Sequence, residues 1–270
     1  MLIWVSALHC EAKPVIDFYR LKKSHDDTAF DHYRGNGMAC IISGTGKIAS
    51  SAACAWVAAR YGDEASIAWI NLGIAGAAQH DIGSIFSLHQ VIDADDGHRY
   101  YPAPASAVEL DGSACMTLSL PSDDYREEYL FDMEASGFMY ATLRFSSAEL
   151  VKSLKIVSDN QREKIGRDRQ RVSDLIHQHI DNIDRQASSL IALNDELAAR
   201  SPGLEYWQQL TSMAHFSQTQ QNRLRVLWRY LMNRDFDAAT LLQQFEEHSP
   251  RAIIKNLEQL SYRDSEGLRP

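Results

Sequence analysis

The segment that decides the fold runs from residue 154 to residue 160 and reads Leu154-Lys155-Ile156-Val157-Ser158-Asp159-Asn160. An apolar run rich in β-branched residues changes here into three small polar residues, which is the pattern of a buried strand that delivers polar groups at its end. In open α/β sheets, ligands bind beyond the carboxyl ends of the strands, so Asp159 is a candidate catalytic acid or base. The alternative is a helix N-cap, because a long helical pattern begins near Arg162.

The charge of the chain is unevenly distributed and suggests two regions that meet near Asn160. The 270 residues carry a formal net charge of -9, which argues against a nucleic-acid partner. From Gln161 onward, 15 lysines and arginines balance 15 aspartates and glutamates, so the residues before it carry the whole deficit. The composition is otherwise that of an ordinary globular protein.

The cysteines and the N-terminal residues predict the compartment. Cys10, Cys40, Cys54 and Cys115 have no metal-ligand spacing, and we expect free buried thiols in a reducing environment. The apolar run over residues 1–8 is short and lacks the basic residues of a signal peptide. No segment has the apolar length that would span a bilayer. We therefore expect a cytoplasmic protein without a membrane partner.

Strand and helix patterns alternate in the first region. Apolar runs predict strands at residues 1–8, 38–43, 66–72, 82–94, 113–120 and 154–160. Helical patterns lie at residues 11–21, 48–61 and 138–145. This alternation predicts an α/β sheet domain.

Two of the predicted strand exits are rich in glycine. They read Gly44-Thr45-Gly46-Lys47 and Gly73-Ile74-Ala75-Gly76, and neither has the spacing of a P-loop. Glycines allow backbone amides to face an anion or a ribose. Acidic residues stand at three strand exits, Glu11, Glu134 and Asp159. For Glu134 the alternative is a cap for the helix that follows, a role that Asp132 could also take.

Acidic and histidine residues elsewhere do not form a convincing metal site. The group Asp93, Asp95 and Asp96 lacks the glycine and the distal glutamate of a calcium loop, so we expect a solvated loop. His177 and His179 lie on different faces of a predicted helix, which makes joint ligation of a metal unfavourable. The sequence therefore predicts no metal.

The second region is helical throughout. Three- and four-residue spacing of apolar residues predicts a long amphipathic helix over residues 172–197. Further helices are expected at residues 204–214, 218–232, 235–246 and 250–260. Their apolar residues are typical of a small helical core, and no cofactor-binding pattern stands out.

With these motifs in hand, residues 1–171 resemble the nucleoside phosphorylase and nucleosidase superfamily, and most closely the nucleosidases that act on methylthioadenosine and adenosylhomocysteine. The resemblance rests on five places in order: Val5–Leu8 with Glu11, Ser43–Lys47, Asn71–Gly76 with Asp81–Gly83, Asp132–Ala135, and Ser158–Asn160. It implies a phosphorylase-like mixed sheet flanked by helices over residues 1–171. Residues 172–270 are then an appended, all-helical region outside the common pattern.

The resemblance also implies roles for single residues. Asp159 matches the acid that protonates the purine, and Glu11 matches the base that activates water. Met133 and Glu134 match the residues that pack beneath the ribose and bind its hydroxyls. The other residues expected to contact substrate are Gly46, Ile74, Gly76, Lys155 and Ser158. The family pattern implies a small nucleoside substrate, neither metal nor organic cofactor, and a homo-oligomer, with a dimer favoured.

Two departures from the family pattern bear on the reaction. Ile74 stands where nucleosidases have a serine, and Lys155 stands where they have an arginine. A phosphorylase needs hydroxyls and cations around its phosphate, so the loss of a hydroxyl favours hydrolysis. The alternatives are a nucleoside phosphorylase that holds phosphate with Lys155 and residues 44–47, or a nucleoside-binding module without turnover.

Overall fold

The computed structural model describes residues 1–25, 29–61, 67–103, 110–122, 125, 128–164, 168–200, 204–232, 234, 236–246 and 248–266. The chain divides into two compact units, Met1–Asn194 and Asp195–Pro270. This boundary differs from the expected one at residue 171, because the helices just after that residue pack on the sheet. For example, the ammonium group of Lys152 in the sheet donates a hydrogen bond to the side-chain oxygen of Gln186. The ring of His179 lies within hydrogen-bonding distance of the carbonyl oxygen of Gly83.

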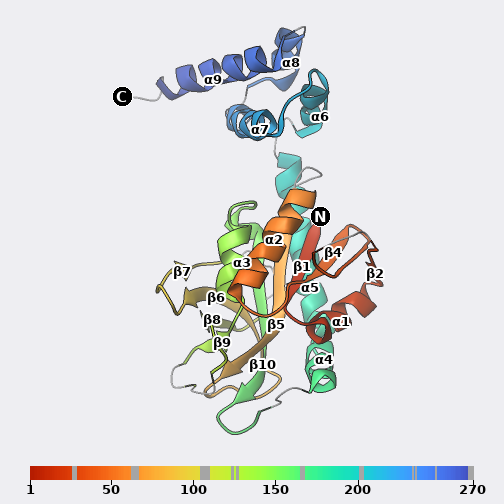
Figure 1. Ribbon diagram of the computed structural model, residues 1–270, viewed down its shortest axis with the longest axis vertical. Coiled ribbons are helices and arrows are strands. Elements are labelled where there is room, and N and C mark those ends of the chain that lie inside the picture. Colours follow the sequence, from red (N-terminus) through yellow and green to blue (C-terminus); the bar gives the residue numbers. More distant parts are fainter. Residues whose placement is uncertain are drawn as a thin grey trace. The chain divides into compact units, whose positions relative to one another are not determined.

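A mixed β-sheet forms the centre of the first unit (Figure 1). Its strands are β1 (Leu2–Ser6), β2 (Lys22–Lys23), β3 (His32–Gly35), β4 (Met38–Ile42), β5 (Ala68–Ala77), β6 (Ile85–Asp93), β7 (Arg99–Tyr100), β8 (Gly112–Thr117), β9 (Leu130–Asp132) and β10 (Val151–Asn160). The strand order is β10-β6-β8-β9-β5-β1-β4-β3-β2, with β7 on β6. β10 also pairs with β5. The five strands β5, β10, β6, β8 and β9 therefore form a closed ring of paired strands.

Parallel pairing brings the predicted strand exits to one edge of the sheet. β4, β1, β5 and β10 are neighbours in that order and run in the same direction. The carboxyl ends of parallel strands meet at one edge, where α/β proteins bind ligands. β9 runs antiparallel to β5, with Phe131 opposite Gly76, and so carries the chain back alongside β5. β9 therefore begins at that edge and leads away from it, so Leu130–Asp132 lie beside the carboxyl end of β5.

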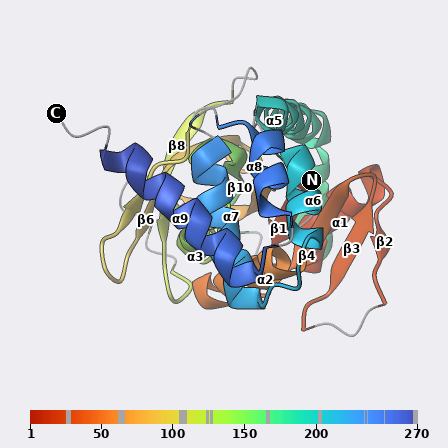
Figure 2. The ribbon, with the colours of Figure 1, turned by 90° about the horizontal axis from the view of Figure 1, so that it is seen from above.

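Helices cover both faces of this sheet (Figures 1 and 2). On one face lie α2 (Lys47–Tyr61) and α3 (Ala135–Thr142), and their apolar residues form a buried core with Ile3, Trp69 and Val157. On the other face lie α1 (His9–Phe18), α4 (Arg169–His177) and the first part of α5 (Ile180–Arg200). The short 3-10 helix Ala148–Leu150 precedes β10. Buried apolar surface on both faces is the main stabilising contribution.

The second unit is a small helical bundle with its own core. It contains the end of α5, α6 (Leu204–Ser212), α7 (Gln218–Met232), α8 (Ala238–Phe245) and α9 (Pro250–Glu266). Leu224, Trp228 and Leu257 are buried in this core. α9 packs on α7, as Figure 2 shows, and Arg223 pairs with Glu258 across the two helices at 2.9 Å. The predicted all-helical character of this region is confirmed.

Most predicted elements are present, with three differences. β5 continues through the glycine-rich segment to Ala77 and does not end at residue 72, because its glycines remain paired with β10. The long helix predicted from residue 172 is broken between α4 and α5, where the ring of His179 lies 2.5 Å from the carbonyl of Gly83. The short strands β2, β3, β7 and β9 were not predicted, because their few residues show no clear apolar alternation.

All four cysteines are free and buried, as expected. No described helix is long and apolar enough to cross a membrane.

Candidate active site

Glu11 is fixed by hydrogen bonds to both of its carboxylate oxygens. It lies in the first turn of α1, where Oε2 accepts the backbone N–H of Leu8 at 2.8 Å, as an acidic residue near a helix start commonly does. Oε1 accepts the backbone N–H of Ile74 in β5 at 3.1 Å. The side chain is buried. Glu11 therefore connects the exit of β1 to the glycine-rich end of β5.

Gly73 allows the carboxylate of Glu11 to lie close to the backbone of β5. A Cβ atom at Gly73 would lie 3.1 Å from Oε1 of Glu11 and 3.4 Å from Nζ of Lys155. The missing side chain lets the carboxylate and the ammonium group both lie against the backbone of β5. Lys155 comes from β10, where it is the register partner of Gly73.

Lys155 forms a fully buried ion pair with Asp132. Nζ lies 2.8 Å from Oδ2, and both side chains are at most 1% exposed. Asp132 also accepts the hydroxyl of Thr117 at 2.7 Å and the backbone N–H of Ala135 at 2.8 Å. Burial by itself would lower the pKa of Lys155, but the charges of Asp132 and Glu134 outweigh it and raise that pKa. The lysine is therefore a permanent cation in this site.

Glu134 completes the group, which we call the acid cluster: Glu11, Asp132, Glu134 and Lys155. Its Oε1 accepts the backbone N–H of Gly46 at 2.8 Å, and Gly46 has the positive φ of +103° that suits glycine. Glu134 occupies the N-cap position of α3, as the capping alternative expects, but its side chain makes no capping hydrogen bond to the helix. Asp132 bonds to the start of that helix in its place.

The acid cluster holds more carboxylates than cations. Burial, together with the charge of Asp132, raises the pKa of Glu134 to about 7, against the opposing charge of Lys155. Burial also raises the pKa of Glu11 above its ordinary value, again opposed by Lys155. Raised carboxyl pKa values of this kind are typical of groups that exchange protons near neutral pH.

The pKa of Glu134 predicts how stability depends on pH. With a folded value of about 7 against an ordinary 4.5, the folded protein keeps a proton that the unfolded chain releases. The contribution of Glu134 to the free energy of unfolding is fully present below pH 4.5. It falls by up to about 3 kcal/mol as the pH rises from 4.5 to about 7. Glu134→Gln is neutral at every pH, so its stability relative to wild type should increase between pH 4.5 and 8. Denaturant unfolding at several pH values measures this difference.

The exposed Glu128→Gln provides the matched control, since it makes the same chemical change on the surface. A stability difference between Glu134→Gln and wild type that stays constant from pH 4.5 to 8 would contradict the prediction.

Asp159 lies further along β10, beyond a bulge. The register of β10 on β5 shifts between Val157 and Asp159, which leaves Ser158 as the extra residue. The hydroxyl of Ser158 donates to Oδ2 of Asp159 at 2.5 Å. Asp159 does not cap the following helix, because Asp168 accepts the first backbone amides of α4. The capping alternative for Asp159 is therefore wrong.

A second ion-pair group lies beside the turn at residues 44–47. Nζ of Lys47 is 2.5 Å from Asp93 and 2.7 Å from Asp95. Asp93 also accepts the hydroxyl of Ser136 at 2.7 Å. The expectation of a solvated loop holds for the exposed Asp95 and is wrong for Asp93, which is buried against Lys47. Among the described residues, no group of three or more side chains has the geometry of a metal site.

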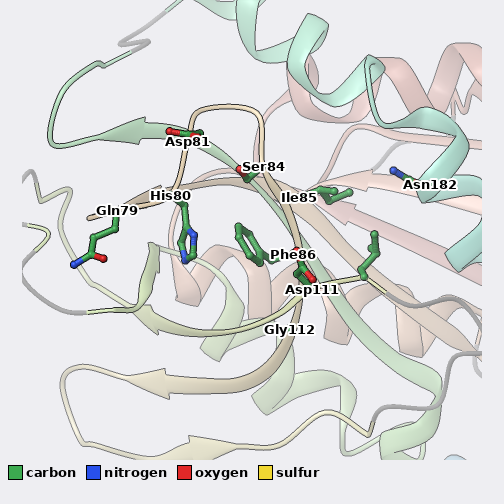
Figure 3. Close-up of a pocket in the computed structure, with 10 residues that line it drawn as sticks. Gln79, His80, Asp81, Ser84, Ile85, Phe86, Asp111, Gly112 and Asn182 are labelled. Atoms are coloured by element: carbon green, nitrogen blue, oxygen red, sulfur yellow. The ribbon is translucent and has the colours of Figure 1, made fainter.

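An open groove of about 830 Å³ lies near the loop between β5 and β6 (Figure 3). Its lining includes His80, Asp81, Phe86, Asp111 and Asn182. None of the site residues predicted from the sequence lines this groove. We place the candidate site at the acid cluster and at Asp159, because buried ionisable groups converge there and the groove has no comparable group.

The structure brings some predicted residues together and adds others. Glu11, Glu134, Gly46, Lys155 and the backbone of Ile74 meet in or beside the acid cluster. Asp159, Ser158 and Gly76 lie together at the paired ends of β5 and β10. Met133 is half-buried between Asp132 and Glu134.

The sequence did not indicate Tyr125 as a residue of this region. It also did not predict the ion pair that Asp132 forms with Lys155. A lysine in the middle of an apolar strand was the available signal for Asp132, because a buried ammonium group needs a buried acid.

The sequence matches no protein-family model and no curated protein. The structure resembles the 5'-methylthioadenosine nucleosidase of Arabidopsis thaliana, with a TM-score of 0.54 and 16% identity over 71% of this chain and 94% of that one. It resembles the 5'-methylthioadenosine/S-adenosylhomocysteine nucleosidase of Neisseria meningitidis in complex with methylthio-immucillin-A, with a TM-score of 0.53 and 14% identity over 70% and 97%.

A third similar structure is the futalosine hydrolase of Helicobacter pylori, with a TM-score of 0.55 and 11% identity over 71% of this chain and 97% of that one. The expected phosphorylase-like sheet is thereby confirmed. The chain has the fold of the 5'-methylthioadenosine/S-adenosylhomocysteine nucleosidases and of futalosine hydrolase.

Proposed function

We propose that this protein hydrolyses the N-glycosidic bond of a purine nucleoside. The observation that carries the proposal is the acid cluster, in which Glu11 and Glu134 are buried, held by backbone amides and arranged around Lys155. Asp159 lies three register positions beyond Gly73 along β5, about 10 Å away at the rise of a strand. Asp159 and the acid cluster therefore lie toward the same end of β5, and we infer that the sugar of the nucleoside lies near the cluster and its base near Asp159.

Each acid has a role that its surroundings support. Cleavage of the bond gives the sugar positive character, which buried carboxylates stabilise, and the base departs most easily when it is protonated. Glu11 has both oxygens in place to take a proton from an attacking water. Glu134, with a pKa of about 7, is suited to hydrogen bonds with ribose hydroxyls. Asp159 supplies the proton to the base, and Ser158 orients its carboxyl group.

The contacts of the cationic side chains favour hydrolysis over phosphorolysis. Lys155 pairs with Asp132, and Lys47 pairs with Asp93 and Asp95. The backbone N–H groups of Gly46 and Ile74 donate to the two glutamates of the acid cluster. Lys155 and the turn at residues 44–47 are the groups with which the phosphorylase alternative would hold its phosphate. Since carboxylates already hold them, phosphate would meet competing negative charge.

The reaction is tested by following release of free base from methylthioadenosine, adenosylhomocysteine, adenosine, inosine and uridine, with and without phosphate. We expect release from at least one purine nucleoside without phosphate. Release that needs phosphate would establish the phosphorylase. Binding of a nucleoside without any release would leave the binding module. The homodimer and the cytoplasmic location stay predictions.

A further inference from the structure

Tyr125 lies directly against the backbone of Gly76. A Cβ atom at Gly76 would come within 2.3 Å of Cζ and Oη of Tyr125, a distance that no real Cβ contact allows. The ring is buried, with 7% of the residue exposed. Its centroid lies 5.4 Å from that of Phe131, with the two rings tilted by 37°. The phenol therefore fills a slot formed by a glycine backbone and an aromatic side chain.

This slot lies beside Asp159. Gly76 has Phe131 of β9 as its partner on one side and Asp159 of β10 as its partner on the other. Residues directly opposite each other in neighbouring strands place their side chains on the same face of a sheet. The ring of Tyr125, which covers the position of the missing side chain of Gly76, is therefore on the same face as the carboxyl group of Asp159.

The backbone of Tyr125 is held at the same place. Its carbonyl accepts the side-chain amide of Gln161 at 2.7 Å, and Gln161 follows Asp159 by two residues. The ring and the main chain of Tyr125 are thus both attached to the ends of β5 and β10. Aromatic rings favour such offset contacts with other rings, and a flat heteroaromatic base would use the same surfaces.

We propose that Tyr125 occupies the position of the nucleobase in the unliganded protein and controls which base can enter. This inference rests on the proposed function, because it takes Asp159 as the acid that faces the base. The phenol covers the area of one six-membered ring, so a purine, with two fused rings, must displace it. Tyr125 is then a specificity-determining residue whose ring competes with the base.

The first experiment measures binding of free adenine by calorimetry, without any turnover. Tyr125→Ala should bind adenine at least ten-fold more tightly than wild type, because the competing ring is gone. Tyr125→Phe keeps the ring and should bind as wild type does. Tyr262→Ala removes an exposed tyrosine of the second unit and is the matched control. Unchanged or weaker binding by Tyr125→Ala would overturn the proposal, since the ring would then be a wall of the site.

A second experiment uses the wild-type protein and so does not depend on how well the variant folds. Saturating adenine should expose Tyr125 to nitration by tetranitromethane, measured on the peptide by mass spectrometry. The exposed Tyr262 should react equally with and without adenine. Protection of Tyr125 by adenine, or no change, would overturn the proposal. Neither readout requires hydrolysis, so failure of the proposed function and failure of this inference give different results.

Discussion

Asp159→Asn is expected to lower kcat for nucleoside hydrolysis by about 10²- to 10⁴-fold, the usual contribution of a general acid. The amide has nearly the shape of the carboxyl group and can still accept the hydroxyl of Ser158. It cannot donate a proton to a departing base. The change should therefore act on kcat more than on KM, and steady-state measurement of base release from the best substrate of the panel tests it.

The matched control is Asp17→Asn, at an exposed aspartate of α1 that pairs with the exposed Lys13. It should leave kcat unchanged. Glu11→Gln should also lower kcat by about 10²-fold or more, because it removes the proton acceptor for water. Wild-type kcat in Asp159→Asn would remove this residue from the chemistry. A binding protein without turnover would show altered affinity in these variants and no rate to compare.

Lys155→Met is expected to destabilise the protein by about 3–5 kcal/mol, the usual cost of removing one partner from a buried ion pair. Methionine fills most of the volume of lysine, so the loss would come from charge. Asp132 would stay buried without its cation, and Glu11 and Glu134 would lose the charge that opposes their burial. Denaturant unfolding at pH 7 measures the loss, which should be smaller at low pH, where the carboxyl groups are protonated.

Lys152→Met is the matched control, because Lys152 is buried in the same strand and bonds to the neutral side chain of Gln186 at 2.8 Å. Burial lowers the pKa of Lys152 to about 8, so its charge at pH 7 opposes folding. The gain on removing that charge should exceed the roughly 1 kcal/mol of the lost hydrogen bond. We therefore expect Lys152→Met to be as stable as wild type or more stable. Equal losses in both variants would mean that Lys155 acts through packing and not through charge.

The presence of lysine and not arginine at position 155 has a physical reason in this site. An arginine would offer five N–H groups, and lysine offers a compact charge that fits between Gly73 and Asp132. The acid cluster thus keeps one cation, and that cation is already paired with Asp132.

Several features of this protein were set by local sequence. Apolar runs such as residues 154–157 determined where the main strands lie, because a buried strand needs side chains that leave water. The glycines at 44 and 46 marked a turn with positive φ, and those at 73 and 76 marked the places where side chains lie against the backbone of β5. Glu11, Glu134 and Asp159 were recognised as acids at strand exits, and their place in the family motif suggested their roles.

Only the tertiary structure decided which groups meet. The sequence indicated that Lys155 was near a site, but its pairing with Asp132 depends on β9 running back along β5 and on the register of β10. The contact of Tyr125 with Gly76 joins segments far apart in the chain, and its own neighbourhood gave no periodic signal for it. Local patterns determine where strands form and end, because they reflect each residue's own burial. Strand order and register determine the contacts, because they arise from packing of the whole sheet.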